Sequence, residues 1–242
     1  MKKSILFIFT ACFLFTTSCS DFLDEEHKTK YSSEYVFGTP EGLKLAVNAL
    51  YALQRYYAND TENATIFALE RGTDLAVTNG GTGNFYGIYD PNYLKPSASQ
   101  VGFMWRTMYQ IIGKANEIIA AAEDLEDTPS LRATVSEAKC FRAQSYFLLY
   151  RTFDRIWLNI QPTTAENVND PRDFHAASEK EVFDLIYEDL EYAITNLDWV
   201  SDEAGRFTQA AARHMKAKAA LWLKDWDTTL EQVEEIEKSG HF

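Results

Sequence analysis

Residues 178–197 read SEKEVFDLIYEDLEYAITNL, and they carry a full set of helix signals. Ser178 and Glu181 have the spacing of a capping box, in which each side chain bonds the backbone N–H of the other residue. Apolar residues then recur at the three- and four-residue spacing of one helix face: Val182, Phe183, Ile186, Leu190, Ala193, Ile194 and Leu197. The stretch therefore predicts an amphipathic helix with one buried side.

Similar helical patterns lie on both sides of this stretch. They predict helices over 40–57, from 101 onward, over 131–153, over 209–223 and over 226–238, with Thr39 and Thr208 as capping residues. The last four helices form two pairs of similar length, and small residues stand where helices would approach closely. This pattern is typical of a tetratricopeptide-like helical-repeat array, so the predicted fold class is all-α, an α-α superhelix.

A long glycine- and aromatic-rich loop is predicted between the first two long helices, over residues 71–99. Aromatic rings can stack on the C–H faces of sugars, and amides can bond to sugar hydroxyls. The candidate ligand-binding residues are Asn84, Phe85, Tyr86, Tyr89 and Tyr93. The alternative is that these rings only pin the loop to the helices.

The N-terminus has the order of a secretory signal. Lys2 and Lys3 precede an apolar run over 5–15, and small residues lead to Cys19. A small residue directly before a cysteine is the pattern of a bacterial lipoprotein, which predicts a signal peptide over 1–18 and lipid attachment, including palmitate, at Cys19. Residues 19–35 are then a tether and 36–242 a helical domain. An ordinary secretory signal is the alternative.

Composition excludes several functions. The net charge of −13 argues against nucleic acid and against electrostatic docking on anionic lipid. The four histidines are scattered without metal-ligand spacing, and no nucleophile elbow or phosphate loop occurs. We therefore expect no catalytic residue, no metal and no cofactor, and a protein that is not an enzyme.

Several individual residues are assigned structural roles. Cys140 is expected to be a buried small hydrophobe, and Arg142 to pair with a carboxylate on a mostly apolar helix. Trp105, Trp222 and Trp226 are expected to pack in the core or between helices.

Five stretches, taken in order, resemble the SusD/RagB family of outer-membrane nutrient-binding lipoproteins. They are Cys19–Asp24, Trp105–Asn116, Glu137–Leu149, Ser178–Leu197 and Gly205–Leu221. The segment Phe153–Leu158 departs from the family, because it lacks the glycine and proline of the usual turn. Family members are about twice as long, so the resemblance is to their N-terminal, tetratricopeptide-like half and the chain looks truncated.

The resemblance implies non-enzymatic capture of an oligosaccharide or oligopeptide. It also implies a cell-surface location on the outer membrane through a lipid anchor, and a partnership with a SusC-type TonB-dependent transporter. The alternative is a helical-repeat adaptor that holds a protein partner and has no small-molecule site.

Overall fold

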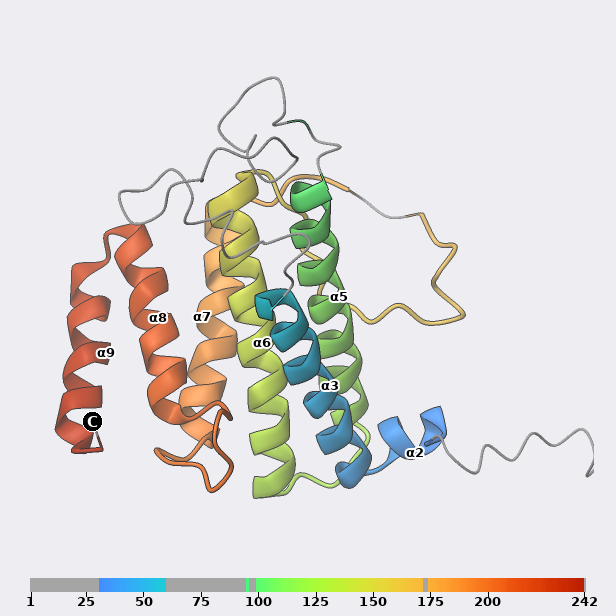
Figure 1. Cartoon of the computed structure of the whole chain (residues 1–242), viewed down its shortest axis with the longest axis horizontal. Helices are drawn as coiled ribbons and strands as arrows, with labels where there is room; N and C mark the ends of the chain where they lie inside the picture. The colour runs from blue at the N-terminus through green and yellow to red at the C-terminus, as the bar shows by residue number, and fades with distance from the viewer. Residues whose placement is uncertain (1–30, 60–94, 96–98, 172–173, 242) are drawn as a thin grey trace, which may run out of the picture. The chain divides into compact units, whose positions relative to one another are not determined.

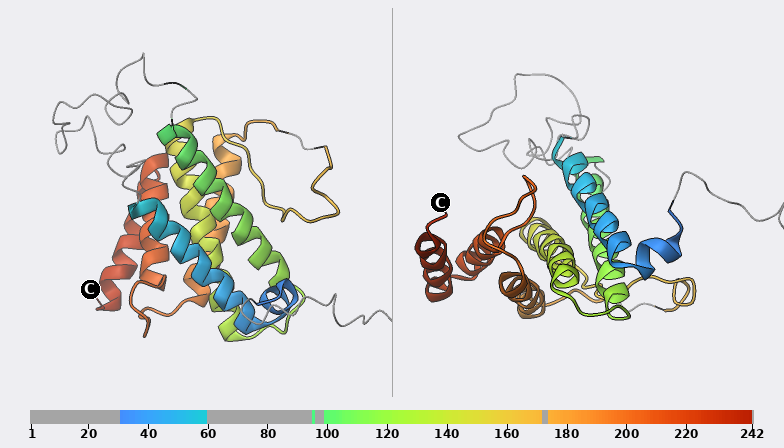
Figure 2. Two further views of the ribbon diagram at one scale, coloured as in Figure 1. Left: turned by 45° about the vertical axis from the view of Figure 1, so that its right-hand side comes forward. Right: turned by 90° about the horizontal axis from the view of Figure 1, so that it is seen from below.

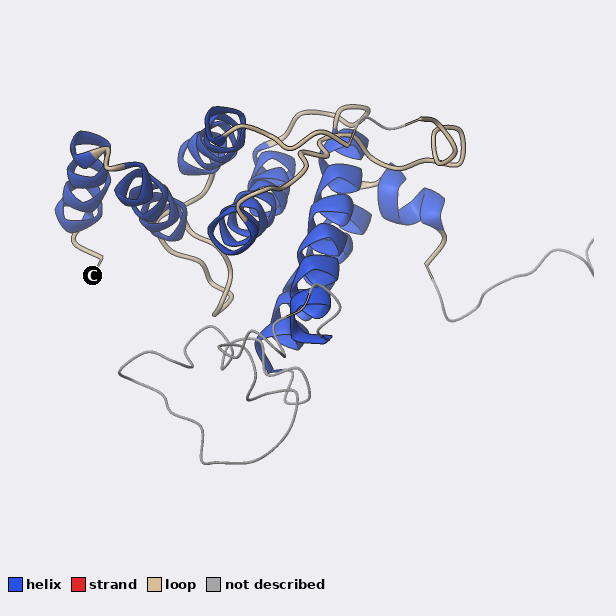
Figure 3. Ribbon diagram, turned by 90° about the horizontal axis from the view of Figure 1, so that it is seen from above, coloured by secondary structure: helices blue, strands red, loops and turns tan. Residues whose placement is uncertain are grey.

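A computed structural model describes residues 31–59, 95, 99–171 and 174–241, and within them the only regular secondary structure is helix (Figures 1 and 3). The helices are α2 (Ser33–Gly38), α3 (Pro40–Asn59), α5 (Ser99–Ala122), α6 (Pro129–Phe153), α7 (Glu179–Asn196), α8 (Gln209–Leu223) and α9 (Trp226–Ser239). Residues 33–242 form one compact unit. The all-α prediction is confirmed, and each predicted long helix is present within a few residues of its expected ends.

The six long helices form three consecutive pairs, α3 with α5, α6 with α7, and α8 with α9 (Figure 1). Neighbouring pairs are joined in a regular way, because α5 packs on α6 and α7 packs on α8. Figure 2 shows the pairs following one another across the array. This is the arrangement of a tetratricopeptide-like repeat, in which each pair buries its apolar side against the next.

Local signals set the helix starts as the sequence predicts. The capping box of α7 is present, with Ser178 and Glu181 each bonding the other's backbone N–H. Thr208 accepts from the N–H of Ala211 and caps α8. Thr39 accepts from the N–H of Gly42 at 3.0 Å and caps α3 in the same way. These bonds satisfy N–H groups that have no partner within the helix.

One glycine is required by a close backbone approach. A Cβ on Gly42 would lie 2.2 Å from the carbonyl oxygen of Tyr35, so any other residue would push α2 away from the first turn of α3.

One hydrophobic core runs through the array, and the whole predicted inner face of α7 belongs to it. Cys140 is fully buried and unpaired, as predicted, and burial raises the pKa of its thiol well above the usual value. Trp105 also packs as predicted, against Tyr109 and Phe153. None of the described helices is long and apolar enough to cross a membrane.

The other two tryptophans are more exposed than predicted. Trp226 is 57% exposed, so the prediction that it packs in the core or between helices is wrong. Trp222 meets Phe147 edge to face across the α6–α8 boundary but is still 47% exposed. Helical spacing placed both residues on apolar stripes, but it could not show that these stripes stay largely exposed among the described residues.

Candidate ligand-binding cleft

The residues predicted to bind ligand lie outside the described part of the chain. This holds for Asn84, Phe85, Tyr86, Tyr89 and Tyr93, and also for Cys19, the signal peptide and most of the tether. The described part of the tether prediction shows one difference, since α2 begins at Ser33, two residues before the expected end of the tether at residue 35.

The helix ends that flank residues 60–98 are described, and they are aromatic. Tyr57, near the end of α3, stacks on Phe103, near the start of α5, with ring centroids 6.1 Å apart. Trp105, in the next half turn of α5, meets Phe153 at the end of α6 edge to face at 5.0 Å. The ends of α3 and α6 and the start of α5 therefore lie close together, at one end of the array (Figure 1).

A continuous row of ring contacts leads from this end to the loop after α6. Trp105 contacts Tyr109 at 4.9 Å, Tyr109 stacks on Trp157 at 6.3 Å, and Trp157 contacts Phe174 at 4.9 Å. We call these four residues the aromatic row. Phe174, its last member, is largely exposed.

A cleft of about 350 Å³, the Trp157 cleft, opens beside this row. It combines one half-buried indole ring with amide, carboxylate and proline side chains. Its lining residues are Trp157, Leu158, Asn159, Ile160, Gln161, Pro162, Asn167, Asp170 and Pro171. One wall is a turn that Asn167 closes, because its amide donates to the carbonyl of Pro162 at 3.0 Å and accepts from the N–H of Thr164 at 2.8 Å.

Two tyrosines, the half-buried Tyr109 and the fully buried Tyr146, hold the floor of the cleft. The Tyr109 hydroxyl donates to the carbonyl of Trp157 at 2.8 Å and accepts from its N–H at 3.0 Å. The Tyr146 hydroxyl does the same for Asn159, at 2.9 and 2.8 Å. One tyrosine hydroxyl therefore binds both backbone groups of Trp157, and a second binds both backbone groups of Asn159, two residues further along the chain. Burial raises the pKa of both phenols, which keeps the donating protons in place.

A charged network lies behind this floor. The amide of Asn116 donates to the carbonyl of Asn159 at 2.7 Å and accepts from Arg142 at 2.8 Å. Arg142 also binds Asp189 through two nitrogens, each at 2.8 Å, and Lys139 donates to the same carboxylate at 2.8 Å. The predicted carboxylate partner of Arg142 is thus Asp189.

The charges in this network are almost fully removed from water. Asp189 is completely buried, and Arg142 and Lys139 are nearly so. Burial alone would lower the pKa of Arg142, but the hydrogen bonds and charge of Asp189 outweigh it and raise that pKa. Through Asn116, this network couples α5, α6 and α7 to the position of the cleft.

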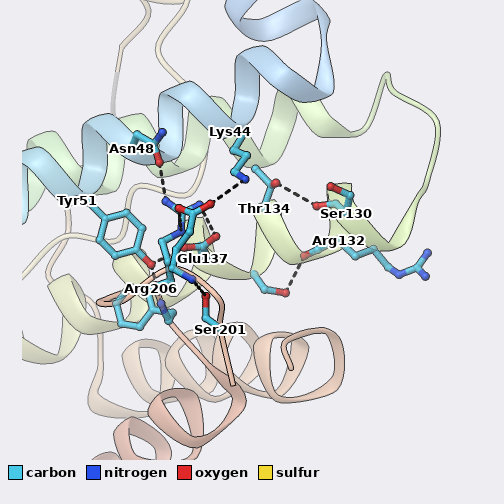
Figure 4. Close-up of polar contacts among 12 residues, drawn as sticks. Lys44, Asn48, Tyr51, Ser130, Arg132, Thr134, Glu137, Ser201 and Arg206 are labelled. Carbon is cyan, nitrogen blue, oxygen red and sulfur yellow. Dashed lines mark hydrogen bonds and ion pairs between the residues drawn. The ribbon is translucent and has the colours of Figure 1, made fainter. Parts of the chain in front are cut away.

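A second polar cluster lies at the other end of α6, around Glu137 (Figure 4). Its carboxylate accepts from the Tyr51 hydroxyl and from Arg206 at 2.9 Å, and Arg206 also donates to Asn48 at 2.5 Å. The Tyr51 hydroxyl in turn accepts from the N–H of Phe207 at 2.7 Å. The cluster therefore ties α3, α6 and the 197–208 loop together.

This second cluster borders a groove of about 580 Å³, but its key groups are already bound to one another. Burial raises the pKa of Glu137, and Tyr51 and Arg206 occupy its two oxygens. The nearby Trp199 ring is also occupied, by the guanidinium of Arg213 at 5.5 Å and the ring of His241 at 6.2 Å. We interpret the Glu137 cluster as a structural clamp.

The Trp157 cleft offers stacking and hydrogen bonding. Among the described residues that line it, Asp170 supplies a carboxylate. Within the described ranges, no group of three potential metal ligands comes together. An aromatic face beside amides is suited to a polyhydroxylated ligand.

Sequence reasoning did not select Trp157 as a site residue. It lies in Phe153–Leu158, the segment that departs from the turn expected after this helix. The sequence feature that could have identified Trp157 is its position as an aromatic residue next to a loop that contains proline and asparagine. The two tyrosines that bind its neighbourhood are distant in sequence, so their role became visible only in the fold.

Comparisons with known proteins agree on one family. A SusD-like family model, described as "Starch-binding associating with outer membrane", matches residues 21–221. A SusD-like protein of Bacteroides ovatus is 28% identical over 240 residues, which are 94% of this chain and 40% of that relative. SusD-like protein P38 of Formosa agariphila is 26% identical over 250 residues, covering 100% of this chain and 47% of that relative. The chain thus spans less than half the length of these curated relatives.

Solved structures with the same fold are also SusD-like. A laminarin-binding SusD-like protein is 25% identical with a TM-score of 0.71, over 81% of this chain and 43% of that one. A SusD-like carbohydrate-binding protein of Bacteroides fragilis is 19% identical with a TM-score of 0.69, over 86% of this chain and 42% of that one. At that lower identity the likeness is one of fold, and it confirms the tetratricopeptide-like assignment.

Proposed function

The chain belongs to the SusD-like family, and we propose that it binds an oligosaccharide at the outer membrane and releases it unchanged. The observation that carries this proposal is the Trp157 cleft. A half-buried indole stands there on a backbone held by two tyrosine hydroxyls, among amide side chains. A rigid aromatic platform reduces the entropy that a bound sugar would otherwise cost.

The predicted aromatic loop would extend the same surface. Residues 60–98 connect the end of α3 to the start of α5, and Tyr57, Phe103 and Trp105 mark that end of the array. From there the aromatic row leads to the cleft. We propose that Tyr86 and Tyr89 supply further stacking positions for the same ligand.

The binding test uses defined probes. Laminarin oligosaccharides, xylogluco-oligosaccharides and malto-oligosaccharides are titrated calorimetrically into the protein. Against whichever probe binds, Trp157→Ala is expected to weaken binding about tenfold, since one lost stacking contact is worth about 1.4 kcal/mol. Tyr86→Ala and Tyr89→Ala are each expected to weaken it by a similar factor.

Trp199→Ala is the matched control, because it removes an indole that Arg213 and His241 already cover. It should leave affinity unchanged. Equal affinity of Trp157→Ala and the original protein would contradict the cleft as the site. No binding of any probe, together with capture of a protein partner, would favour the helical-repeat adaptor instead.

We further propose that lipid on Cys19 anchors the protein and that a SusC-type transporter receives the ligand. The acidic composition gives no electrostatic route to an anionic membrane, so attachment depends on the acyl chains. Cys19→Ala is expected to move the protein from the membrane fraction to the soluble fraction. Affinity capture of the original protein from outer membranes should recover the transporter, and its absence would contradict the partnership.

A further inference from the structure

A small cavity of about 110 Å³ lies where the three helix pairs meet. Five helices line it, and each contributes at least one side chain: Gln54 of α3, Met108 of α5, Gln144 of α6, Ile186 of α7 and Met215 of α8. We call the space between these five residues the Gln144 cavity. It shares no lining residue with the Trp157 cleft, so it is a separate feature of the fold.

The inner side of the Gln144 cavity is apolar. Met108, Ile186 and Leu190 line it there, and all three side chains are buried in the core. The half-buried Met215 lines it from α8. Methionine side chains are flexible and adapt to irregular shapes, so this side suits a small aliphatic group.

The outer side of the cavity carries positive charge. Arg151 of α6 and Lys218 of α8 line it and are exposed, and the Arg151 guanidinium lies 4.6 Å from the centroid of the Phe147 ring. Among the described residues, neither cation forms an ion pair, and none of those that line the cavity is acidic. In a protein with a net charge of −13, two unpaired cations at one cavity favour an anionic ligand.

Gln144 supplies a hydrogen-bond acceptor that the protein does not use. Its side-chain Oε1 is buried and has no hydrogen-bond partner within the described ranges. A buried acceptor without a donor is unfavourable, and nearly all such groups in folded proteins find a partner. The cavity therefore calls for a ligand with an N–H group in addition to its negative charge and its aliphatic part.

We propose that the Gln144 cavity binds the C-terminal residue of a peptide that ends in a small aliphatic side chain. That side chain would lie against Met108 and Ile186. The terminal carboxylate would pair with Arg151 and Lys218, and the last backbone N–H would donate to Gln144 Oε1. A free amino acid fits less well, because its ammonium group would face the two cations without a carboxylate from the described lining beside it.

The binding test compares ligands that differ in one group. N-acetyl-L-valine and N-acetyl-Gly-Gly-Val are titrated into the full chain and followed by NMR, with millimolar dissociation constants expected for such small ligands. Converting the carboxylate of either ligand into an amide should weaken binding about tenfold or more, because hydrogen bonds to a charged group are lost. Free L-valine should bind about tenfold more weakly than N-acetyl-L-valine.

Three outcomes of these titrations would overturn the proposal. The first is equal binding of the acid and the amide. The second is equal binding of inorganic phosphate, which needs only the two cations. The third is binding of N-acetyl-L-valine without binding of N-acetyl-Gly-Gly-Val, because the site would then take a small acylated amino acid and not the end of a peptide.

Variants of the lining test the placement of each group. Arg151→Gln and Lys218→Gln should each weaken peptide binding about fivefold, whereas Lys114→Gln, at an exposed lysine of α5 that does not line the cavity, should leave it unchanged. Gln144→Leu should also weaken binding about fivefold, without lowering the midpoint of thermal unfolding, because it removes a buried group that lacks a partner. Unchanged peptide affinity in these three cavity variants would overturn the proposal.

One further variant separates this cavity from the proposed oligosaccharide site. Trp157→Ala removes the indole of the cleft and should leave peptide affinity unchanged, because the two sites share no lining residue. A loss of peptide binding in Trp157→Ala would place the peptide in the cleft and would overturn the assignment to the Gln144 cavity.

Discussion

The pairs α6/α7 and α8/α9 are built by similar local rules yet have opposite surroundings. In both pairs the second helix is amphipathic and begins with a capping side chain, Ser178 for α7 and Asp225 for α9. The apolar side of α7 is buried against α6 and α8, whereas α9 carries an exposed apolar stripe of Trp226, Leu230 and Val233. A helix's own sequence therefore decides that it has an apolar side, and its position in the array decides whether that side is covered.

The main charged network of each pair differs in the same way as the apolar side, because the network in α6/α7 is buried and the one on α9 is exposed. In α6/α7, Asp189 is fully buried between Arg142 and Lys139. In α9, the acids near the stripe are exposed or bind Lys238 at the surface. Buried pairs are expensive to break and surface pairs contribute little, so substitutions should separate the two pairs clearly.

The largest expected effect is at Asp189. Asp189→Asn leaves Arg142 and Lys139 buried without a negative charge, which should destabilise the protein by about 3–5 kcal/mol. Asp184→Asn is the control on the same helix, because its pair with Lys180 is exposed. Urea denaturation measures both, and equal stability of the two variants would contradict the importance of the buried network.

The next largest effect comes from comparing a leucine on the buried side of α7 with a leucine on the exposed stripe of α9. Leu190→Ala in α7 should cost about 2–5 kcal/mol by leaving a cavity, whereas Leu230→Ala in α9 should change stability by less than about 0.5 kcal/mol. Thermal unfolding of both variants checks this. A large loss at Leu230 would mean that the exposed stripe of α9 is already covered in solution.

A smaller effect is expected at the floor of the cleft. Tyr146→Phe leaves the N–H and carbonyl of Asn159 without the hydroxyl, for a cost of about 1–3 kcal/mol. Tyr187→Phe is its control, because the hydroxyl of Tyr187 is buried and has no hydrogen-bond partner among the described residues. Comparable losses in these two variants would show that the Asn159 contacts do not set the stability of the cleft.

The two capping residues should behave alike despite the different pairs. Ser178→Ala at α7 and Thr208→Ala at α8 should each cost about 1 kcal/mol, because each removes one acceptor for an otherwise unpaired N–H. Denaturant midpoints give both values. A several-fold difference between them would mean that tertiary context, rather than the local bond, dominates at helix starts.

The smallest effect concerns pH. The hydroxyl and N–H of Ser178 donate to Glu181 and lower its pKa below the usual 4.5. The unfolded state then binds more protons in that window, so this contribution is present above about pH 4.5 and is lost as the pH falls through the folded pKa. Glu181→Gln should flatten the fall in stability in acid, as should Ser178→Ala. An unchanged acid profile in both variants would exclude the linkage.

Much of the fold could be predicted from sequence because its signals are local. Caps at Ser178 and Thr208, the periodicity of α7 and the burial of Cys140 depend on residues a few positions apart, and the structure confirms them. The pairing of Arg142 with some carboxylate was also predictable, since a buried guanidinium needs one. Which carboxylate it was could not be predicted, because Asp189 is 47 positions away.

The site was less accessible to sequence reasoning. The loop residues chosen for their composition, Asn84 through Tyr93, lie outside the described chain and stay a prediction. The backbone of Trp157 is held by Tyr109 of α5, and that of Asn159 in the same cleft is held by Tyr146 of α6. A periodic pattern in the sequence does not show that side chains from two helices bind the same loop segment.

By itself, the sequence determined the helices, their starts and ends, their apolar sides, and the resemblance to one family. These follow from interactions within a turn or two of helix, which any local stretch contains. Only the tertiary structure decided which carboxylate neutralises Arg142, where the backbone of the cleft is held, and which apolar side stays open. Those outcomes depend on contacts between residues far apart in the chain, and their energies exist only once the pairs have stacked.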